Sequence, residues 1–380
     1  MDASSTALLP ADHAQAILVG RVLLPQGPTP VVVRGGTVYD VSATAPTVAD
    51  LLERENPGAV EGVAICGVEA IGTESDPRLL APIDLQCVKA CGVTFAVSAI
   101  ERVIEERARG DADKAAAIRG DLEARVGSGI RSVVPGSAEA ANLKAALIDA
   151  GMWSQYLEVA IGPDAEVFTK APVLSSVGWG DDIGIRSDSD WNNPEPEIVL
   201  VVDRNGVVRG ATLGNDVNLR DFEGRSALLL GKAKDNNAST SIGPFIRLFD
   251  DSFTMDDVRS AVVDLTIDGP EGYRLSGTNK MSEISRDPTD LVRQALSEHQ
   301  YPDGFALFLG TLFAPVQDRD HVGRGFTHKV DDVVRISTPK LGTLVNRVTT
   351  SKAAAPWEFG IRDLMRNLAE RGLLAQKATA

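Results

Sequence analysis

The stretch PEPEIVLVVD, residues 194–203, constrains the fold more than any other part of the chain. Residues 198–202 are continuously apolar, which is typical of a strand buried on both faces. Asn205-Gly206 follows, the strongest short signal for a two-residue hairpin turn, and a second apolar run comes after it. The sequence therefore predicts a buried antiparallel hairpin with its turn at 205–206.

Two acidic residues, Glu195 and Glu197, stand at the head of this strand. Strand side chains alternate, so both carboxylates project from one face, with Cα atoms roughly 6.5–7 Å apart. The return strand leads to Asp216, and pairing around the turn brings residues near 214 toward residues near 197. Three hard oxygen ligands suit Mg²⁺ or Mn²⁺. The alternative is that the glutamates are solvated at a sheet edge and that Asp216 caps a turn.

Two lysines, Lys232 and Lys234, follow in LLLGKAKDNNAST. If this segment is extended, both side chains lie on one face. A lysine beside a second ammonium group and a divalent cation has its neutral form favoured, which makes Lys234 a candidate general base. The alternative is a pair of solvated surface lysines.

Composition narrows the class of protein. The chain has 380 residues, a formal net charge of −15 and three cysteines. Such a charge disfavours nucleic acid and anionic membrane surfaces as partners. The cysteine count does not indicate a disulfide framework, and no apolar run approaches the length of a membrane span. We expect a cytoplasmic protein.

The distribution of apolar runs predicts an α+β fold. Residues 1–85 read as a small αβ domain, with a hairpin turn at Gly35-Gly36 and a helix capped by Thr47. Residues 86–380 form the larger domain, with a helical insertion near 95–150. Further helices are predicted from the caps Ser137 and Asp287 and near the C-terminus, and strands at 259–268, 304–309, 332–337 and 343–349.

Between about residues 85 and 350 the chain resembles the fumarylacetoacetate hydrolase superfamily. The resemblance rests on the order and spacing of Glu195-x-Glu197, LGNDVNLRD (213–221), Lys234, SIGPF (241–245), FLGTLFAP (308–315) and VDDVVRISTPKLGTLVNRV (330–348). It implies a mixed β-roll catalytic domain, generally dimeric, in which Glu195, Glu197 and Asp216 bind Mg²⁺. It also implies that Lys234 is catalytic and that Thr311 contacts the substrate.

One departure from the superfamily pattern bears on the reaction. Hydrolases of the superfamily carry a motif like N-Y-x-x-H-x-x-E, whose His and Glu activate water. This chain has VTFAVSAIE at 93–101, in which Ser98 occupies the His position and Glu101 remains. A serine hydroxyl is a poor base near neutral pH, so elimination of water fits better than hydrolysis. Within the superfamily the chain is similar to the 2-keto-3-deoxy-D-xylonate dehydratases of oxidative pentose catabolism.

This resemblance implies a metal-dependent hydro-lyase acting on a 2-oxo sugar acid. Mg²⁺ would act as a Lewis acid toward the keto acid. We expect Lys234 to remove a C3 proton and Ser98 and Glu101 to bind or protonate the departing C4 hydroxyl, giving 2-oxoglutarate semialdehyde. Further substrate contacts are expected from Thr311, Thr278, Ser276 and Lys232.

Two other functions remain open on the sequence. One is a hydrolase that cleaves a C–C bond of an acylpyruvate, and the other is a protein that binds 2-oxo acids without turning them over. The sequence also leaves open the substrate stereochemistry and chain length, the use of Mn²⁺ or Ca²⁺ in place of Mg²⁺, and the choice between homodimer and homotetramer.

Overall fold

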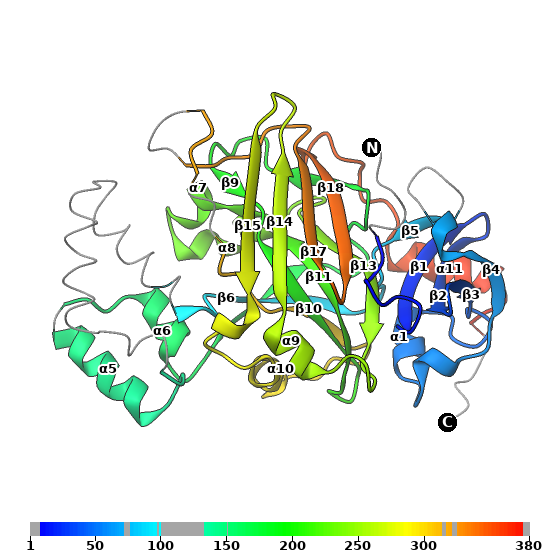
Figure 1. The fold of residues 1–380 in the computed structure, drawn as a ribbon, viewed down its shortest axis with the longest axis horizontal. Coiled ribbons are helices and arrows are strands. Elements are labelled where there is room, and N and C mark those ends of the chain that lie inside the picture. The colour runs from blue at the N-terminus through cyan, green and yellow to red at the C-terminus, as the bar shows by residue number, and fades with distance from the viewer. Residues whose placement is uncertain are drawn as a thin grey trace.

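The computed structural model describes residues 8–71, 77–96, 99, 133–149, 151–313, 317–320 and 325–374. Figure 1 shows two sheets crossing in the middle of the molecule, with α5 (Ala138–Asp149) and α6 (Gln155–Ile161) at one end. The first strands of the chain lie at the other end, where α11 (Ile361–Glu370) covers them.

The remaining elements have the following bounds. The strands are β1 (Leu18–Leu24), β2 (Gly27–Arg34), β3 (Thr37–Asp40), β4 (Val63–Gly67), β5 (Arg78–Leu80), β6 (Cys87–Gly92), β7 (Glu166–Ala171), β8 (Asp182–Ile185), β9 (Asn192–Asn193), β10 (Pro196–Val202), β11 (Val208–Asp216), β12 (Asn218–Leu219), β13 (Thr240–Leu248), β14 (Val262–Asp268), β15 (Arg274–Lys280), β16 (Phe305–Phe308), β17 (Val333–Thr338) and β18 (Gly342–Thr350). The helices are α1 (Val48–Leu52), α7 (Arg220–Glu223), α8 (Leu230–Lys234), α9 (Met255–Ser260) and α10 (Pro288–Leu296).

The architecture confirms the predicted α+β class and mixed sheet. The larger sheet has the order β4-β3-β2-β1-β13-β11-β10-β16-β6-β7, with β5 paired to β1. The smaller one has the order β15-β14-β17-β18-β8, and β9 pairs with β12 separately. Most neighbours are antiparallel, but β16 runs parallel to β6 and β18 parallel to β8.

Strand β10 lies between two hydrophobic layers, which explains its continuous apolar run. Ile198, Leu200 and Val202 face one core cluster, which includes Leu265 of β14 and Ile336 of β17 in the smaller sheet. The alternate side chains face a second cluster, made with residues of β6, β13 and β16: Val199, Val201, Val88, Ile242 and Phe308. Because both faces are buried, no polar position is tolerated between the head of the strand and its hairpin turn.

Most local predictions are confirmed. The β10–β11 hairpin turns at 203–207, and β2 and β3 turn at Gly35-Gly36. Thr47 caps α1 and Asp287 caps α10 through side-chain oxygens that accept N–H bonds. The strand predicted at 259–268 begins late, at Val262, because a capping box of Thr254 and Asp257 starts the short helix α9 first.

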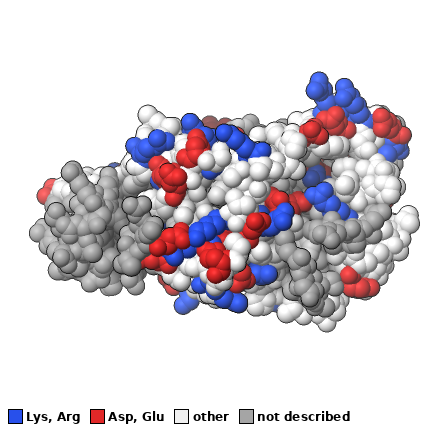
Figure 2. All heavy atoms as spheres, turned by 90° about the horizontal axis from the view of Figure 1, so that it is seen from above, with Lys and Arg blue, Asp and Glu red and all other residues white. Residues whose placement is uncertain are grey.

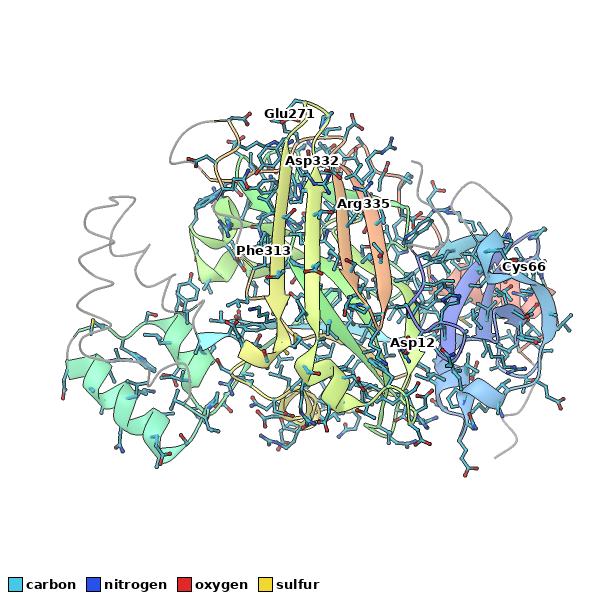
Figure 3. The ribbon with its side chains drawn as sticks, viewed as in Figure 1. Asp12, Cys66, Glu271, Phe313, Asp332 and Arg335 are labelled. Carbon is cyan, nitrogen blue, oxygen red and sulfur yellow. The ribbon has the colours of Figure 1, made fainter. Side chains whose placement is uncertain are left out.

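The N-terminal strands join the rest of the larger sheet through the ladder between β1 and β13. Strand β1 pairs with β13, with Leu18 opposite Arg247 and Val19 opposite Ile246. The buried Arg247 guanidinium also binds Asp12, with an Nη1–Oδ1 distance of 2.6 Å. Asp12 lies beside this junction in Figure 3.

This ion pair predicts a pH-dependent loss of stability. The Arg247 hydrogen bond lowers the pKa of Asp12 from 3.8 to about 2. Because the pKa of Asp12 is lower in the folded state than in the unfolded state, the ionised carboxylate stabilises the fold at any pH above the unfolded-state pKa. This contribution is lost as the pH falls from about 4 toward 2. We expect Asp12→Asn to cost about 1–2 kcal/mol at neutral pH, discounted for its partial exposure, and to cost almost nothing near pH 2. Urea unfolding at several pH values measures this difference, and a cost independent of pH would contradict the assignment.

Opposite charges lie side by side on the face seen from above in Figure 2. Beneath the surface, the loop between β14 and β15 meets the segment before β17, where Arg319 pairs with both Glu271 and Asp332. His328, one of the four histidines, is buried in this network and its Nδ1 lies 3.0 Å from Asp332.

No helix among the described residues is long and apolar enough to cross a membrane.

Candidate metal centre

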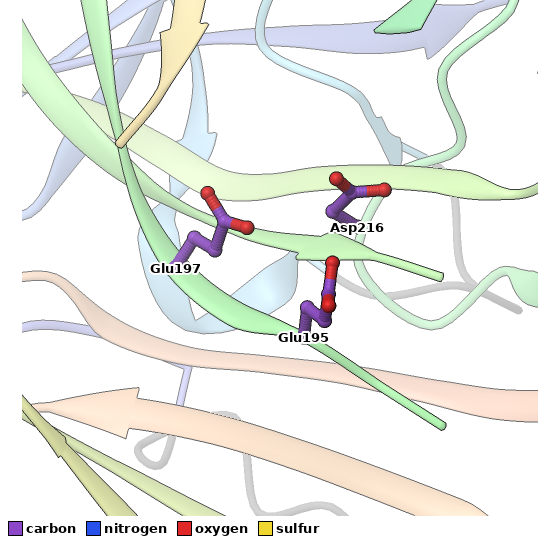
Figure 4. A group of neighbouring side chains, drawn as sticks. All are labelled: Glu195, Glu197 and Asp216. Carbon is purple, nitrogen blue, oxygen red and sulfur yellow. The ribbon is translucent and has the colours of Figure 1, made fainter. Parts of the chain in front are cut away.

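The β10–β11 hairpin brings the three predicted acidic ligands together. Glu197 lies opposite Gly214 in the ladder, and Pro196 lies opposite Asn215. Glu195 therefore comes opposite Asp216, whose backbone N–H donates to the Glu195 carbonyl at 3.1 Å. Since residues two apart share a face, all three carboxylates project from the same side of the hairpin. Figure 4 shows them pointing toward one another.

These carboxylates form a buried acidic cluster. One oxygen from each of Glu195, Glu197 and Asp216 lies within 4.8 Å of the other two, and all three residues are buried. Burial raises the pKa of Glu195, and burial together with repulsion from Asp216 and Glu195 raises the pKa of Glu197 well above its usual range. Such a site needs positive charge to hold the carboxylates ionised, and its donors are those that Mg²⁺ prefers.

Backbone N–H groups hold two of the three acidic residues in place. The Gly310 N–H donates to Glu197 Oε2 at 2.6 Å, and the Glu195 N–H donates to the Asn215 side chain at 3.2 Å. Gly310 has φ +91°, and a Cβ there would lie 2.2 Å from Thr94 Oγ1. Both the backbone conformation and the contact therefore require glycine after β16.

Lys234, the last residue of α8, reaches the cluster from the side. Its Nζ lies 2.5 Å from Glu195 Oε2 and 3.0 Å from Asp216 Oδ2. Burial by itself would lower the pKa of Lys234, but Asp216 and Glu195 outweigh it and raise that pKa well above its usual range. In the absence of a metal ion, Lys234 is therefore an ammonium group that neutralises part of the acidic cluster.

The expected pairing of Lys232 with Lys234 is wrong, because the segment is helical and not extended. In α8 the two side chains point in different directions, and Lys232 is exposed, with its Nζ 5.5 Å from the Phe222 ring centroid. The structure does not bring Lys232 to the carboxylates.

A different lysine supplies the second ammonium group, and sequence reasoning missed it. Lys170 of β7 is fully buried, and its Nζ lies 3.0 Å from Asp216 Oδ1. It also donates to the backbone carbonyls of Lys234 and Ser239. Burial lowers the pKa of Lys170 against the opposing pull of Asp216. The only signal in the sequence is a lysine inside the strand-like run EVFTKA, a position where a charge needs a partner.

The predicted substrate contacts divide between two places. Thr311 lies directly after Gly310, next to the Glu197 contact, and its Oγ1 accepts the Phe313 N–H at 3.1 Å. Ser276 and Thr278 lie on β15 and are exposed, whereas Leu275 and Asn279 of the same strand are buried. Since strand side chains alternate, the structure does not bring Ser276 and Thr278 to the acidic cluster.

Ser98 and Glu101 lie outside the described residues. Thr94, four residues before Ser98 in the chain, is buried, and its Oγ1 donates to the Leu309 carbonyl at 2.7 Å. Leu309 precedes Gly310, so Thr94 lies beside the loop that contacts Glu197.

Comparison with known proteins decides the family. The model of the fumarylacetoacetate (FAA) hydrolase C-terminal domain matches residues 140–349, more than half of the chain. The chain belongs to the fumarylacetoacetate hydrolase family. The matched region contains the three carboxylates, both buried lysines and Thr311, so the acidic cluster lies within the family domain.

Two proteins with similar sequences are named as dehydratases. The chain is 33% identical over 202 residues to a probable 2-keto-3-deoxyxylonate dehydratase of Haloferax volcanii, covering 53% of this chain and 66% of that protein. It is 31% identical over 186 residues to a 2-dehydro-3-deoxy-D-arabinonate dehydratase of Saccharolobus solfataricus, covering 48% of this chain and 58% of that protein. The similarity thus spans slightly less than two thirds of the length of either relative.

Solved structures of the family share the fold. A 2-keto-3-deoxy-D-arabinonate dehydratase complexed with magnesium and 2,5-dioxopentanoate is similar with a TM-score of 0.63 and 22% identity, over 88% of this chain and 99% of that one. A fumarylacetoacetate hydrolase from Exiguobacterium antarcticum is similar with a TM-score of 0.56 and 18% identity, over 88% of this chain and 100% of that one. These likenesses establish the β-roll architecture and do not separate the two chemistries.

Proposed function

We propose that this protein is a Mg²⁺-dependent dehydratase that removes water from a 2-keto-3-deoxy sugar acid. The observation that carries the proposal is the buried cluster of Glu195, Glu197 and Asp216 with the Lys234 amine in contact with two of its members. The dehydratases named above support the choice of reaction, because the chain is 33% and 31% identical to them over 202 and 186 residues. Ser98, in place of a water-activating histidine, argues against hydrolysis.

The cluster suits a divalent cation on the grounds of its own chemistry. Three buried carboxylates repel one another, and the two lysines that contact them, Lys170 and Lys234, do not balance all three negative charges. Glu195, Glu197 and Asp216 would hold Mg²⁺, which would supply Lewis-acid polarisation of the keto oxygen and so favour loss of a C3 proton.

Lys234 is the proposed base. Its amine lies beside two of the three ligands, so a keto acid held at the same centre would place C3 within its reach. In the structure the amine carries a proton that its carboxylate partners stabilise. Acting as a base therefore requires that a cation take over the charge of Glu195 and Asp216, which couples Lys234 to occupation of the metal centre.

The reaction balances without an oxidant or a second substrate. The C3 proton passes to Lys234, the C4 hydroxyl leaves with a proton as water, and a C3–C4 double bond forms. A proton shift from C5 to C3 then gives an enol at C4–C5, which tautomerises to 2-oxoglutarate semialdehyde when the substrate is a 2-keto-3-deoxypentonate. Ser98 and Glu101 are the proposed donors to the leaving hydroxyl. The proposed substrate is 2-keto-3-deoxy-D-xylonate.

An assay of 2-keto-3-deoxy acids derived from xylonate, arabinonate and hexonates tests the proposal. We expect semialdehyde or the corresponding dehydrated product, with activity lost in EDTA and restored by MgCl₂. Mn²⁺ and Ca²⁺ are included in the restoration series. Release of pyruvate from acylpyruvates would instead favour the hydrolase, and stabilisation by 2-oxo acids without product would favour a binding protein.

A further inference from the structure

Asn279 of β15 spans the gap between the metal ligands and the loop that carries Thr311. The residue is fully buried. Its Nδ2 donates to the Pro196 carbonyl at 3.1 Å, and its Oδ1 accepts the Leu312 N–H at 3.1 Å. One amide thus satisfies a carbonyl on β10 and an N–H on the loop after β16, two groups that are otherwise 116 residues apart in the chain.

The two ends of this bridge are functionally distinct. Pro196 lies between the proposed ligands Glu195 and Glu197. Leu312 directly follows Thr311, the residue expected to contact the substrate. A buried amide with both polar atoms paired has one strongly preferred orientation, because rotating it would leave buried groups unsatisfied. The bridge therefore fixes the distance between the metal side and the substrate side of the site.

Packing on the same face of β15 supports the seating of this loop. Phe313 lies against Gly277, where a Cβ would come 1.9 Å from the Phe313 ring. Figure 3 shows Phe313 beside β15. Gly277 and Asn279 are two residues apart and share a face of β15. Gly277 leaves room for the Phe313 ring, and Asn279 accepts the hydrogen bond from the Leu312 N–H.

We propose that Asn279 is a positioning residue, which holds Thr311 at its working distance from the metal centre. This inference rests on the proposed function. The positioning role of Asn279 extends the proposed function to β15, a strand of the smaller sheet that supplies neither a proposed metal ligand nor the proposed base.

The geometry predicts that loss of Asn279 affects the substrate side selectively. Glu195 keeps its bond to Asn215, and Glu197 keeps its place in the β10–β11 ladder and its bond from Gly310. The loop after Gly310 keeps the packing of Phe313 against Gly277, but Leu312 N–H loses its acceptor on β15. Mg²⁺ affinity should then survive while the placement of Thr311 does not.

The experiment compares Asn279→Ala with the unmodified protein in two measurements. For turnover of the 2-keto-3-deoxy acid, we expect kcat/KM to fall on the order of 10²-fold, the usual effect of a misplacement of about 1 Å. For Mg²⁺ binding by calorimetry, we expect the Kd to stay within about threefold, well below the 10–100-fold typical when a partner that orients a ligand is lost.

A matched control is Asn346→Ala. Asn346 of β18 is equally buried and its Nδ2 donates to two backbone carbonyls, those of Gly178 and Asp181, both at 2.9 Å. It touches neither β10 nor the 309–313 loop in these contacts. We expect a comparable loss of thermal stability with little change in kcat/KM. Equal losses of activity in both variants would overturn the proposal, because the effect would then be general destabilisation.

A double-mutant cycle with Thr311→Ala tests whether Asn279 acts through Thr311. If it does, the combined loss in kcat/KM is much smaller than the product of the two single losses. Independent, multiplying losses would overturn the proposal, as would an Asn279→Ala variant whose Mg²⁺ affinity falls as far as its activity.

The inference is separable from the proposed reaction. If the unmodified protein dehydrates none of the acids, the proposed function fails, and 2-oxoglutarate binding to the Mg²⁺-loaded protein becomes the readout. Weaker 2-oxoglutarate binding in Asn279→Ala, with Mg²⁺ binding unchanged, supports the positioning role in that case. Unchanged 2-oxoglutarate binding overturns it.

Discussion

Replacement of Asp216 by asparagine is expected to abolish tight Mg²⁺ binding and, with it, turnover. Asp216 is the only one of the three carboxylates that ion-pairs with both buried lysines among the described residues, at 3.0 Å from each. Asparagine keeps the volume but removes the charge that both cations and a metal ion share. Loss of an outer partner alone costs about 10–100-fold in metal affinity, so loss of this ligand should cost more than about 100-fold. Calorimetric titration with MgCl₂ measures it.

Asp203→Asn is the matched control for Asp216→Asn. Asp203 is buried near the opposite end of the same hairpin, where it accepts the Asn205 and Val207 N–H groups and pairs with Arg209 at 2.7 Å. Its replacement should lower the free energy of unfolding and leave Mg²⁺ affinity unchanged. If Asp216→Asn bound Mg²⁺ as tightly as the Asp203 variant, the cluster would be structural.

Replacement of Lys234 by methionine is expected to separate catalysis from metal binding. Turnover by the Mg²⁺-saturated variant should fall about 10²–10⁴-fold, the usual contribution of a positioned proton-transfer group. Removing one partner from a buried ion pair costs about 3–5 kcal/mol, so the metal-free variant should be less stable. Added Mg²⁺ should restore much of that stability, since a cation then faces Glu195 and Asp216 again. Steady-state kinetics and urea unfolding with and without MgCl₂ measure the two effects.

Lys232→Met is the control for that experiment. Lys232 precedes Lys234 by two residues in α8 but is exposed and does not contact the carboxylates. We expect unfolding stability close to that of the unmodified protein. Lys234→Met with near-normal turnover would rule out its role as base, whatever the effect on stability.

The hairpin and the convergence of its three carboxylates could be predicted because the information is local. The turn at Asn205-Gly206 sets the register, and the register alone places Glu195, Glu197 and Asp216 on one face. The caps Thr47 and Asp287 were predictable for the same reason, since each bond closes within a few residues.

The remaining parts of the site depend on contacts between distant segments. Lys170 reaches Asp216 across 46 residues of chain, and Asn279 reaches Pro196 across 83. Neither has a motif of its own, because a buried lysine or asparagine becomes informative only when its partner is known. The prediction that Lys232 and Lys234 share one face was wrong for a local reason. It assumed an extended segment, but these residues belong to the short helix α8, which points their side chains in different directions.

The pairing of β1 with β13 covers a sheet edge that would otherwise have unpaired backbone groups. Strand β13 is bonded on its other side to β11, the strand that ends at Asp216. Without β1, the backbone N–H and C=O groups of β13 around Ile246 and Arg247 would form an unpaired sheet edge. A strand from a second copy of the chain could pair with such an edge. The N-terminal strands thus cover a sheet edge that lies one strand away from the hairpin carrying the acidic cluster.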